Sequence, residues 1–209
     1  MIGDILPADV RWAEEFGDPG GAFLLPEEEP SVARAVDKRV REYTTVRHCA
    51  RRALAGLGYG PLPILNGPNR EPLWPDGVIG SLTHCDGYRA AVVTRAGALR
   101  SLGIDAEPNA PLPAGVLDTV ASPAEQAHLA SLARQDSEVH WDRLLFSAKE
   151  SVYKTWFPLA RAWLGFEEAT LEFDPAGEFS AKILKPGPLA SVAGRWTVSR
   201  GLVVTSIAL

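Results

Sequence analysis

Features that would place the chain in a specialised class are scarce. Only two cysteines occur, Cys49 and Cys85, and neither forms a C-x-x-C pair or lies near a histidine at zinc-ligand spacing. No apolar run approaches the roughly 18 residues of a membrane span, and the acidic N-terminus lacks the basic and then apolar order of a signal peptide. We therefore expect reduced thiols, no membrane contact and a cytoplasmic location.

An excess of positive charge is also missing. The formal net charge is −5 at pH 7, which argues against a protein that binds nucleic acid through bulk charge. A hydrophobic fraction of 46% with 22% charged residues is ordinary for a packed globular protein, so a disordered or fibrous chain is not expected.

The first clear helical pattern begins at Ser31, which can cap a helix. Apolar residues then recur at roughly helical spacing until Gly56 and Gly58. Basic residues gather on the polar side of this predicted helix: Arg34, Lys38, Arg39, Arg41, Arg47, Arg51 and Arg52. The sequence thus predicts a long amphipathic helix with a basic face in an otherwise acidic protein.

Irregular and strand-like segments surround this helix. We expect an irregular lead-in with one short helix over residues 1–30, and a loop anchored by Trp74 over Gly67 to Gly77. Three hairpins are predicted, pairing residues 90–94 with 101–107, 169–173 with 179–184, and 196–199 with 202–208.

Two further helices are predicted in the middle of the chain. One covers residues 122–133 with Ser122 and Pro123 as cap and first turn, and the other covers residues 141–157 and is ended by Pro158. This order indicates an α+β fold in which two similar halves each contribute a helix and a hairpin, although the halves share no obvious sequence repeat.

Two acidic residues lie close together in the segment Gly103-Ile104-Asp105-Ala106-Glu107, at the end of an apolar strand. Alternate residues of a strand share a face, so Asp105 and Glu107 would point the same way. Like charges at that spacing repel unless a cation lies between them, and Mg²⁺ prefers carboxylate oxygens. A divalent-cation site is one interpretation, and a solvated strand end is the alternative.

A second charged group occurs inside the strongly apolar helix predicted at residues 141–157. Glu150 and Lys154 are four residues apart, a spacing that by itself indicates only a weak surface ion pair. The apolar neighbours instead favour partial burial of Lys149 and Glu150, and buried charges are retained for a reason. Glu150 would then be a third metal ligand.

A histidine, His84, lies at the entrance of a strand, in the segment from Gly80 to Cys85. The hydroxyls of Ser81 and Thr83 and the flexible backbone of Gly80 are suited to phosphate oxygens. Together with the basic helix, these residues predict a polyphosphate site, and a structural histidine is the alternative.

Four segments, read in this order, resemble the surfactin-synthetase type of phosphopantetheinyl transferase, and most of all its actinobacterial members. They are K-R-V-R-E-Y-T-T-V-R-H-C-A-R (Lys38 to Arg51), E-P-L-W-P-D-G-V-I-G-S-L-T-H-C-D-G-Y-R-A-A (Glu71 to Ala91), G-I-D-A-E-P (Gly103 to Pro108) and W-D-R-L-L-F-S-A-K-E-S-V-Y-K-T-W-F-P-L (Trp141 to Leu159). The resemblance covers most of the chain from the first helix onward.

This resemblance implies an α+β fold of two pseudo-symmetric halves, residues 1–108 and 109–209, with coenzyme A and the active site in the cleft between them. It implies an enzyme dependent on Mg²⁺, with Mn²⁺ as a substitute, that transfers the 4′-phosphopantetheine group of coenzyme A to a serine of an acyl or peptidyl carrier protein. The product 3′,5′-ADP would leave. The carriers would belong to fatty-acid, polyketide or nonribosomal-peptide systems, neither nucleic acid nor a membrane would take part, and we expect a monomer.

The resemblance also implies roles at matching positions. Mg²⁺ would be held by Asp105, Glu107 and Glu150, with the backbone of Ala106 close to its coordination shell. Glu150, directly or through a water, would accept the proton of the carrier serine, whose oxygen attacks the phosphorus next to pantetheine. Lys154 would neutralise charge near the transferred group, together with Lys149.

Coenzyme A would be bound mainly by residues before the acidic strand. Arg39 and Arg47 would bind its 3′-phosphate and adenosine end, and Thr83 and His84 would meet its phosphates. The stretch Asn66-Gly67-Pro68-Asn69 matches one that in relatives often brings a lysine to the nucleotide. Asparagines stand there in this chain, so Arg70 is the candidate substitute.

Three apolar residues have two interpretations each. Phe157, Trp163 and Leu164 would line the pantetheine channel or dock the carrier, or else they are core residues.

Two other functions remain open from the residues. A Mg²⁺-dependent nucleotide or diphosphate hydrolase would use the same acidic clusters and basic rim with water as the nucleophile. A module that binds carrier proteins or coenzyme A without chemistry is the third candidate. The set formed by Asp105, Glu107, Lys149 and Glu150 argues against a pure binder, which has no need of metal ligands.

Overall fold

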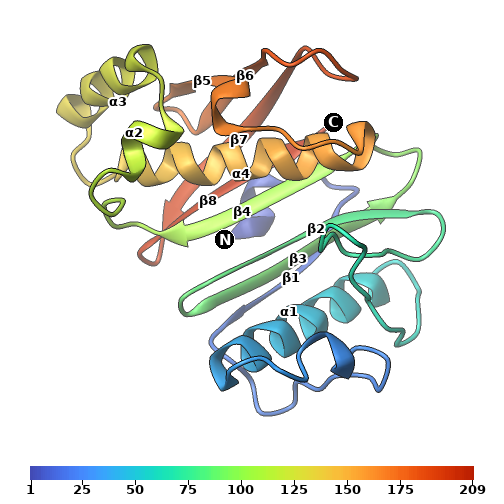
Figure 1. The fold of residues 1–209 in the computed structure, drawn as a ribbon. Coiled ribbons are helices and arrows are strands. Elements are labelled where there is room, and N and C mark those ends of the chain that lie inside the picture. The colour runs from blue at the N-terminus through green and yellow to red at the C-terminus, as the bar shows by residue number, and fades with distance from the viewer. The chain divides into compact units, whose positions relative to one another are not determined.

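Two compact units make up the computed structural model, which describes all 209 residues (Figure 1). The N-terminal unit comprises Ile2 and Leu6–Leu102, and the C-terminal unit comprises Met1, Gly3–Ile5 and Gly103–Leu209. The strand that carries Asp105 therefore begins the C-terminal unit, whereas the sequence assigned it to the N-terminal half. Its sheet neighbour is the last strand of the chain, which explains the difference.

The N-terminal unit is one long helix packed on a three-stranded sheet. Its strands are β1 (Arg11–Phe16), β2 (Val78–Cys85) and β3 (Tyr88–Arg95), arranged in the antiparallel order β1-β3-β2. Helix α1 (Asp37–Ala55) covers one face of this sheet (Figure 1). Small and apolar side chains fill the interface, among them Cys49, Ala50, Ala53, Leu54, Ala91 and Val93. Close helix-to-sheet packing follows from their small volume.

The C-terminal unit has a five-stranded sheet in the order β4-β8-β7-β6-β5. Its strands are β4 (Leu102–Pro108), β5 (Ala169–Asp174), β6 (Glu178–Ile183), β7 (Ser191–Ser199) and β8 (Leu202–Ala208). Helix α4 (Trp141–Ala160) runs along the sheet, and α2 (Val116–Val120) and α3 (Pro123–Gln135) lie beside it (Figure 1). The core is rich in aromatic and branched residues, including Trp141, Leu144, Leu145, Val152, Trp156, Phe173 and Phe179.

Several predicted elements are confirmed. Strands β5 and β6 pair across a short turn, and so do β7 and β8. The turn of the second hairpin is Arg200-Gly201, where both residues have positive φ, as the tight hairpin turns require. Ser122 caps α3 and forms a capping box with Glu125, which matches the predicted start of that helix.

Other predicted elements are wrong. Strands β3 and β4 do not form a hairpin, because β3 pairs with β1 and β2 while β4 lies beside β8. Strand β2 was not predicted, because several of its residues are polar; it pairs with β3 across the turn Asp86-Gly87. Strand β1 was missed in the lead-in, where Pro and Gly are dense, and it lies at a sheet edge, where pairing constrains the sequence least.

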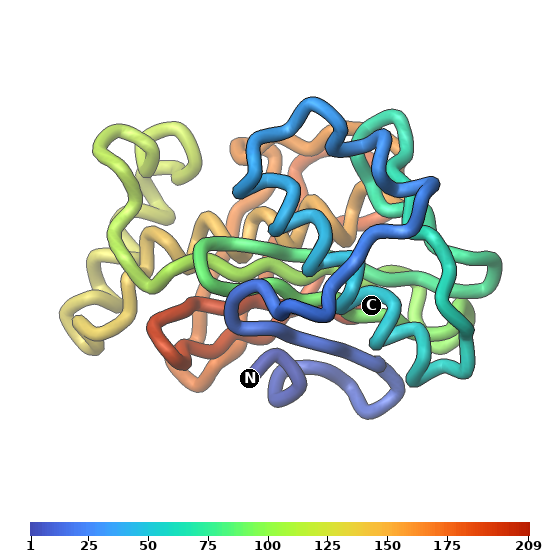
Figure 2. Tube along the Cα trace, turned by 90° about the horizontal axis from the view of Figure 1, so that it is seen from below, coloured from blue at the N-terminus to red at the C-terminus, as the bar shows by residue number.

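The predicted helix boundaries are partly wrong. Helix α1 begins at Asp37 rather than after Ser31, which ends a short 3₁₀ turn, η2 (Glu29–Ser31). Helix α4 continues through Pro158 to Ala160, since proline removes one hydrogen bond but the last turn of a helix can absorb that loss. The connection between α1 and β2 is mostly irregular, as predicted, and appears in teal in Figure 2. None of the helices combines the length and apolar character needed to cross a membrane.

Candidate active site

Strand β4 and helix α4 bring the predicted acidic residues of the C-terminal unit together with two cations. Asp105 is 5% exposed, and its Oδ1 accepts a hydrogen bond of 2.7 Å from Nζ of Lys154. The same ammonium donates to the carbonyl oxygen of Ile104 at 3.0 Å. Two residues further along β4, the carboxylate of Glu107 accepts a hydrogen bond of 3.1 Å from Nη1 of Arg143. Lysine and arginine thus neutralise the two β4 carboxylates.

The close approach of α4 to β4 depends on Gly103. A Cβ atom there would overlap the carbonyl oxygen of Ser151 and Oγ1 of Thr155 on α4. Small hydroxyl residues hold α4 to β8 in the same region, where Oγ of Ser151 lies 2.7 Å from Oγ1 of Thr205. Glycine and small polar residues let the helix lie directly on the strands. The acidic strand and the acid-bearing helix are therefore in contact.

The charge of Asp105 repels the charges of both Glu107 and Glu150. Burial and the charge of Asp105 raise the pKa of Glu107, and Arg143 opposes the rise. Burial raises the pKa of Glu150 as well, with Lys154 opposing and Asp105 adding to the rise. A bound cation would favour the ionised form of either glutamate and so oppose the rise in its pKa.

Hard divalent cations suit this set of oxygen donors. Mg²⁺ prefers carboxylate and carbonyl oxygens, which Asp105, Glu107, Glu150 and the backbone of Ala106 supply. The side chains do not stand as a ready-made metal cluster, because no group of three histidine, cysteine or acidic residues is close enough to form one. The chemistry of the donors fits a magnesium ion, and Lys154 is the cation beside Asp105 in this structure.

Lys149 has a different set of neighbours from Glu150, the next residue. Its Nζ donates to the carbonyl oxygen of Val120 at 2.6 Å, to the carboxylate of Glu125 at 3.1 Å and to the carbonyl oxygen of Phe166 at 2.9 Å. Both side chains of the Lys149–Glu125 pair are only 2% exposed. Burial lowers the pKa of Lys149, and the hydrogen bond and charge of Glu125 oppose that effect.

The N-terminal unit joins Arg39 and His84 from α1 and β2. Nη1 of Arg39 lies 2.8 Å from Nε2 of His84, so the imidazole accepts this bond because arginine can only donate. Glu42 lies 3.6 Å from the same nitrogen. Arg39 and His84 are exposed, whereas Thr83 is 2% exposed. The predicted phosphate residues therefore include one adjacent pair at the surface.

Arg47 and the predicted nucleotide loop are also brought together. Arg47 donates to the carbonyl oxygen of Ile64 at 3.1 Å and to Oδ1 of Asn66 at 2.5 Å, and its guanidinium lies 3.8 Å above the ring of Tyr43. Burial lowers the pKa of Arg47. The two hydrogen bonds of Arg47 hold the start of the predicted nucleotide loop against α1.

A tight turn follows within this loop. Gly67 donates its N–H to the carbonyl oxygen of Glu71 at 2.7 Å, and the Glu71 carboxylate accepts from the N–H of Asn69 at 2.9 Å. Pro68 lies between them at the surface. Arg70 has a φ of 68°, in the left-handed region, and its side chain is exposed. The loop thus presents an arginine to solvent from a constrained turn.

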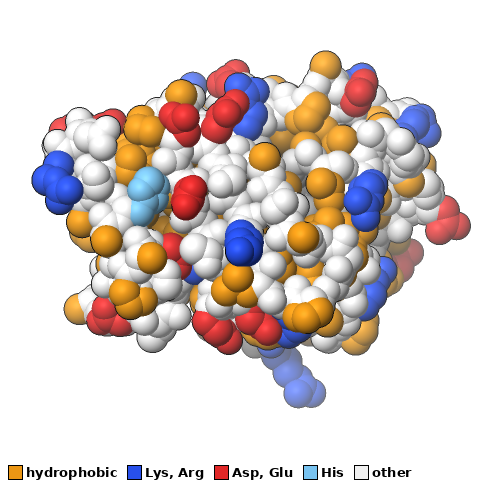
Figure 3. Space-filling view, turned by 90° about the horizontal axis from the view of Figure 1, so that it is seen from above, with side chains coloured by type: hydrophobic (Ala, Val, Ile, Leu, Met, Phe, Trp, Pro, Cys, Tyr) orange, Lys and Arg blue, Asp and Glu red, His pale blue; other side chains and the backbone are white.

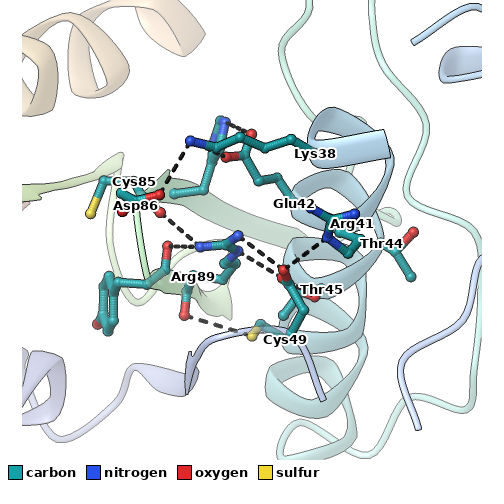
Figure 4. A network of polar contacts seen from close by, with 12 residues as sticks. Lys38, Arg41, Glu42, Thr44, Thr45, Cys49, Cys85, Asp86 and Arg89 are labelled. Atoms are coloured by element: carbon teal, nitrogen blue, oxygen red, sulfur yellow. Dashed lines mark hydrogen bonds and ion pairs between the residues drawn. The ribbon is translucent and has the colours of Figure 1, made fainter. Parts of the chain in front are cut away.

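Most of the predicted basic face of α1 is paired with acidic residues. Lys38 pairs with Asp86 at 3.2 Å, and Arg41 lies 3.7 Å from Asp18 (Figure 4). The remaining pairs on this face are Arg51 with Glu28, which is fully buried, and Arg52 with Glu15. On the face drawn in Figure 3, acidic and basic side chains are likewise interspersed, without a large area of one sign.

Three buried charged residues were missed from the sequence. Arg89 is 4% exposed, pairs with Asp18 at 3.0 Å and donates to the carbonyl oxygen of Cys85 at 2.7 Å, which braces the turn after His84 (Figure 4). Glu28 and Glu125 are the others. Only Glu125 carried a local signal, its place three residues after Ser122 in a capping box.

The three apolar candidates separate by exposure. Phe157 and Leu164 are buried, whereas Trp163 is 66% exposed and its ring centroid lies 4.9 Å from that of Tyr153. Burial supports a core role for the first two, and Trp163 remains available at the surface.

Comparison with known proteins points to one family for both units. A family model described as the 4′-phosphopantetheinyl transferase N-terminal domain matches residues 27–94, and one described as the 4′-phosphopantetheinyl transferase superfamily matches residues 101–205. The gap between the two matches contains the β3–β4 connection.

Curated relatives extend the match to the whole chain. The chain is 51% identical to 4′-phosphopantetheinyl transferase PptT of Mycobacterium tuberculosis, over 100% of this chain and 98% of that protein. It is 52% identical to 4′-phosphopantetheinyl transferase Svp of Streptomyces mobaraensis, over 100% and 89%, and 48% identical to 4′-phosphopantetheinyl transferase Npt of Nocardia iowensis, over 100% and 99%. The predicted resemblance to actinobacterial members is confirmed.

Proposed function

This chain belongs to the 4′-phosphopantetheinyl transferase superfamily, and we propose from that premise that it transfers 4′-phosphopantetheine from coenzyme A to a serine of a carrier protein. The observation that carries the proposal is sequence identity: about half of all positions are identical to those of named transferases over the full length of this chain. The carriers are acyl or peptidyl carrier proteins of fatty-acid, polyketide or nonribosomal-peptide synthesis.

The acidic residues of β4 and α4 are the proposed metal ligands. Asp105, Glu107 and Glu150 would hold Mg²⁺ or Mn²⁺, with the backbone of Ala106 beside it. The bound ion would supply positive charge to the phosphate oxygens, whose negative charge resists attack by a nucleophile. The raised pKa values of Glu107 and Glu150 support this assignment, because partial burial disfavours their charged forms and a bound cation would favour them.

The transfer forms one bond and breaks one bond. The oxygen of the carrier serine attacks the phosphorus next to pantetheine, and the bond from that phosphorus to 3′,5′-ADP breaks. Glu150 accepts the serine proton, directly or through a water. Lys154 lies on the same helix face as Glu150 and neutralises the phosphate that carries the transferred group.

Residues of the N-terminal unit are the proposed ligands of the nucleotide end of coenzyme A. The exposed Arg39 and His84 pair would bind phosphate, with Thr83 beside them on β2. Arg47 would act at the nucleotide and hold the loop in place through Asn66. The same loop, continuing through Gly67, Pro68 and Asn69, would offer Arg70 as its cation.

Intact-mass spectrometry of an apo carrier protein tests the proposal directly. The carrier is incubated with the enzyme, coenzyme A and Mg²⁺, with parallel samples that contain EDTA or a carrier Ser→Ala variant. We expect a gain of one phosphopantetheine group that is absent from both controls. An unchanged carrier with coenzyme A consumed would indicate a hydrolase, and no change in either would indicate a binding module.

A further inference from the structure

Lys149 has all of its hydrogen-bonding capacity used inside the C-terminal unit. A lysine ammonium has three donors and no acceptor, and Lys149 places one on Val120, one on Glu125 and one on Phe166. The side chain is 2% exposed. A phosphate could reach this ammonium only if the protein gave up those bonds, so contact with substrate is not the role that the geometry supports.

Glu125 is the residue that joins Lys149 to two other segments of the C-terminal unit. Its carboxylate accepts from the N–H of Ser122 at 2.8 Å and from the N–H of Leu171 at 3.0 Å, in addition to Lys149. One side chain therefore ties the first turn of α3 to β5 and to α4. Both oxygens of this buried carboxylate accept hydrogen bonds, so its acceptors are satisfied inside the unit.

The network fixes α4 on the side away from the acidic strand. Successive residues of a helix lie about 100° apart around its axis, so Lys149 and Glu150 face different neighbours. Gly103 of β4 contacts α4 at Ser151 and Thr155, which fixes the helix from the opposite side. With both sides fixed, neither rotation nor sliding of α4 can carry Glu150 away from Asp105 without breaking one set of contacts.

We propose that Glu125 and Lys149 are positioning residues, which hold α4 so that Glu150 faces the carboxylates of β4. This inference rests on the proposed function, since it assigns Glu150 to the reaction. It replaces the expectation that Lys149 neutralises the transferred phosphate. The two roles predict different results when Glu125, which no phosphate would approach, is changed.

The test is a double-mutant cycle of Glu125→Gln, Lys149→Met and the combined variant. Each single change leaves one buried charge without its partner, so we expect the melting temperature to fall by about 10 °C. Displacement of Glu150 should lower kcat by roughly 10- to 100-fold, with the KM for coenzyme A within about twofold of wild type. The double variant has neither of these two charges, so no unpaired charge is left at this position, and we expect it to regain at least about fivefold in kcat over either single variant.

Direct contact between Lys149 and phosphate gives the opposite pattern. Glu125→Gln would then keep full kcat, and the double variant would be as inactive as Lys149→Met alone. Either result would overturn the inference. Lys185→Met, which removes the partner of Glu168 from a partly exposed ion pair at 3.0 Å, is the matched control and should leave kcat and melting temperature unchanged. Should Lys149→Met fail to fold, Glu125→Gln decides, because unchanged kcat there rejects positioning.

A second readout separates this inference from the proposed function. Mn²⁺ affinity is measured by calorimetry, and changes in residues that orient metal ligands typically weaken it by about 10-fold or more, which we expect for Glu125→Gln. If the wild type binds Mn²⁺ but modifies no carrier protein, the proposed function fails and the positioning role is judged on affinity. If wild type and Glu125→Gln bind Mn²⁺ equally well, or neither binds it, positioning is rejected.

Discussion

At the scale of single residues, the number of basic side chains on α1 overstates the positive charge available to a ligand. Arg51 is bound to the fully buried Glu28, and Arg52, Arg41 and Lys38 each have an acidic neighbour. The sequence predicted which residues are basic but not which are neutralised, because their partners lie up to 48 positions away in the chain. Arg39 differs, because its partner is a histidine.

Arg39→Ala should therefore weaken coenzyme A binding more than the loss of any one surface charge. A hydrogen bond to a charged group contributes about 1.5–3 kcal/mol, so we expect the KM for coenzyme A to rise about tenfold or more. Steady-state kinetics at saturating carrier protein measures the change. Arg34→Ala, which removes an exposed arginine that precedes α1, is the control. Equal KM values for the two variants would exclude Arg39 from the nucleotide site.

Cys49 illustrates how burial suppresses reactivity. Burial raises the pKa of its thiol to about 12, and nearby Glu15 adds to the rise. At pH 8 the thiolate fraction is then about one part in 10⁴, and the thiolate is the form that attacks disulfide reagents. We expect a Cys85→Ser variant, which leaves Cys49 alone, to release almost no colour from Ellman's reagent until it is denatured. Rapid reaction of that variant in its native state would contradict the buried assignment.

At the scale of elements, the sequence predicted helices and local hairpins well and long-range strand pairing poorly. The β7–β8 hairpin has its turn signal in the sequence, at Arg200-Gly201, so it could be predicted locally. Strand β4 lies beside β8, which follows about a hundred residues later in the chain. No local sequence pattern near β4 predicts this pairing. The acidic pair on β4 was found because its spacing is local, whereas the Glu125–Lys149 contact was missed because it joins two helices.

Gly103 is the position at which the packing of β4 on α4 can be tested. Alanine there would force the strand and the helix apart, because the atoms it overlaps include backbone as well as a side chain. Overpacking of this kind typically costs about 1–3 kcal/mol, which corresponds to a fall in melting temperature of roughly 3–10 °C for a chain of this size. Carrier modification should fall with it, since β4 and α4 carry the proposed metal ligands. Thermal unfolding and intact mass measure the two effects.

Gly60→Ala is the matched control for that substitution. A Cβ at Gly60 would meet no atom within 4 Å, and its φ lies outside the left-handed region. We expect no loss of stability or activity. If Gly103→Ala were as stable and as active as Gly60→Ala, the close contact between β4 and α4 would be refuted.

At the scale of the whole molecule, the two units carry different parts of the predicted chemistry. All three proposed metal ligands belong to the C-terminal unit, and the predicted phosphate residues of α1 and β2 belong to the N-terminal unit. Each unit has its own sheet and its own hydrophobic core. The matched family models follow the same division, at residues 27–94 and 101–205. The proposed metal ligands and the predicted phosphate residues can therefore be tested by substitutions in separate units.

Removal of the metal should abolish transfer and leave the fold intact. Lys154 and Arg143 already neutralise Asp105 and Glu107 without a metal, so the carboxylates do not depend on the ion for stability. Transfer does depend on it, because the proposed metal supplies charge that is worth several kcal/mol at the phosphate, and we expect EDTA to lower the rate by about 100-fold or more. The melting temperature should change by less than about 2 °C, within what 1 kcal/mol or less would produce.

Excess Mg²⁺ or Mn²⁺ should restore the rate, and NaCl at equal ionic strength should not. Thermal unfolding with and without EDTA provides the stability measurement, and intact mass of the carrier provides the rate. A fall of 10 °C or more in EDTA would mean that the ion is part of the folded structure and that Lys154 and Arg143 do not compensate for its absence. Full activity in EDTA would remove the metal from the reaction and would leave Lys154 as the main cation beside Asp105.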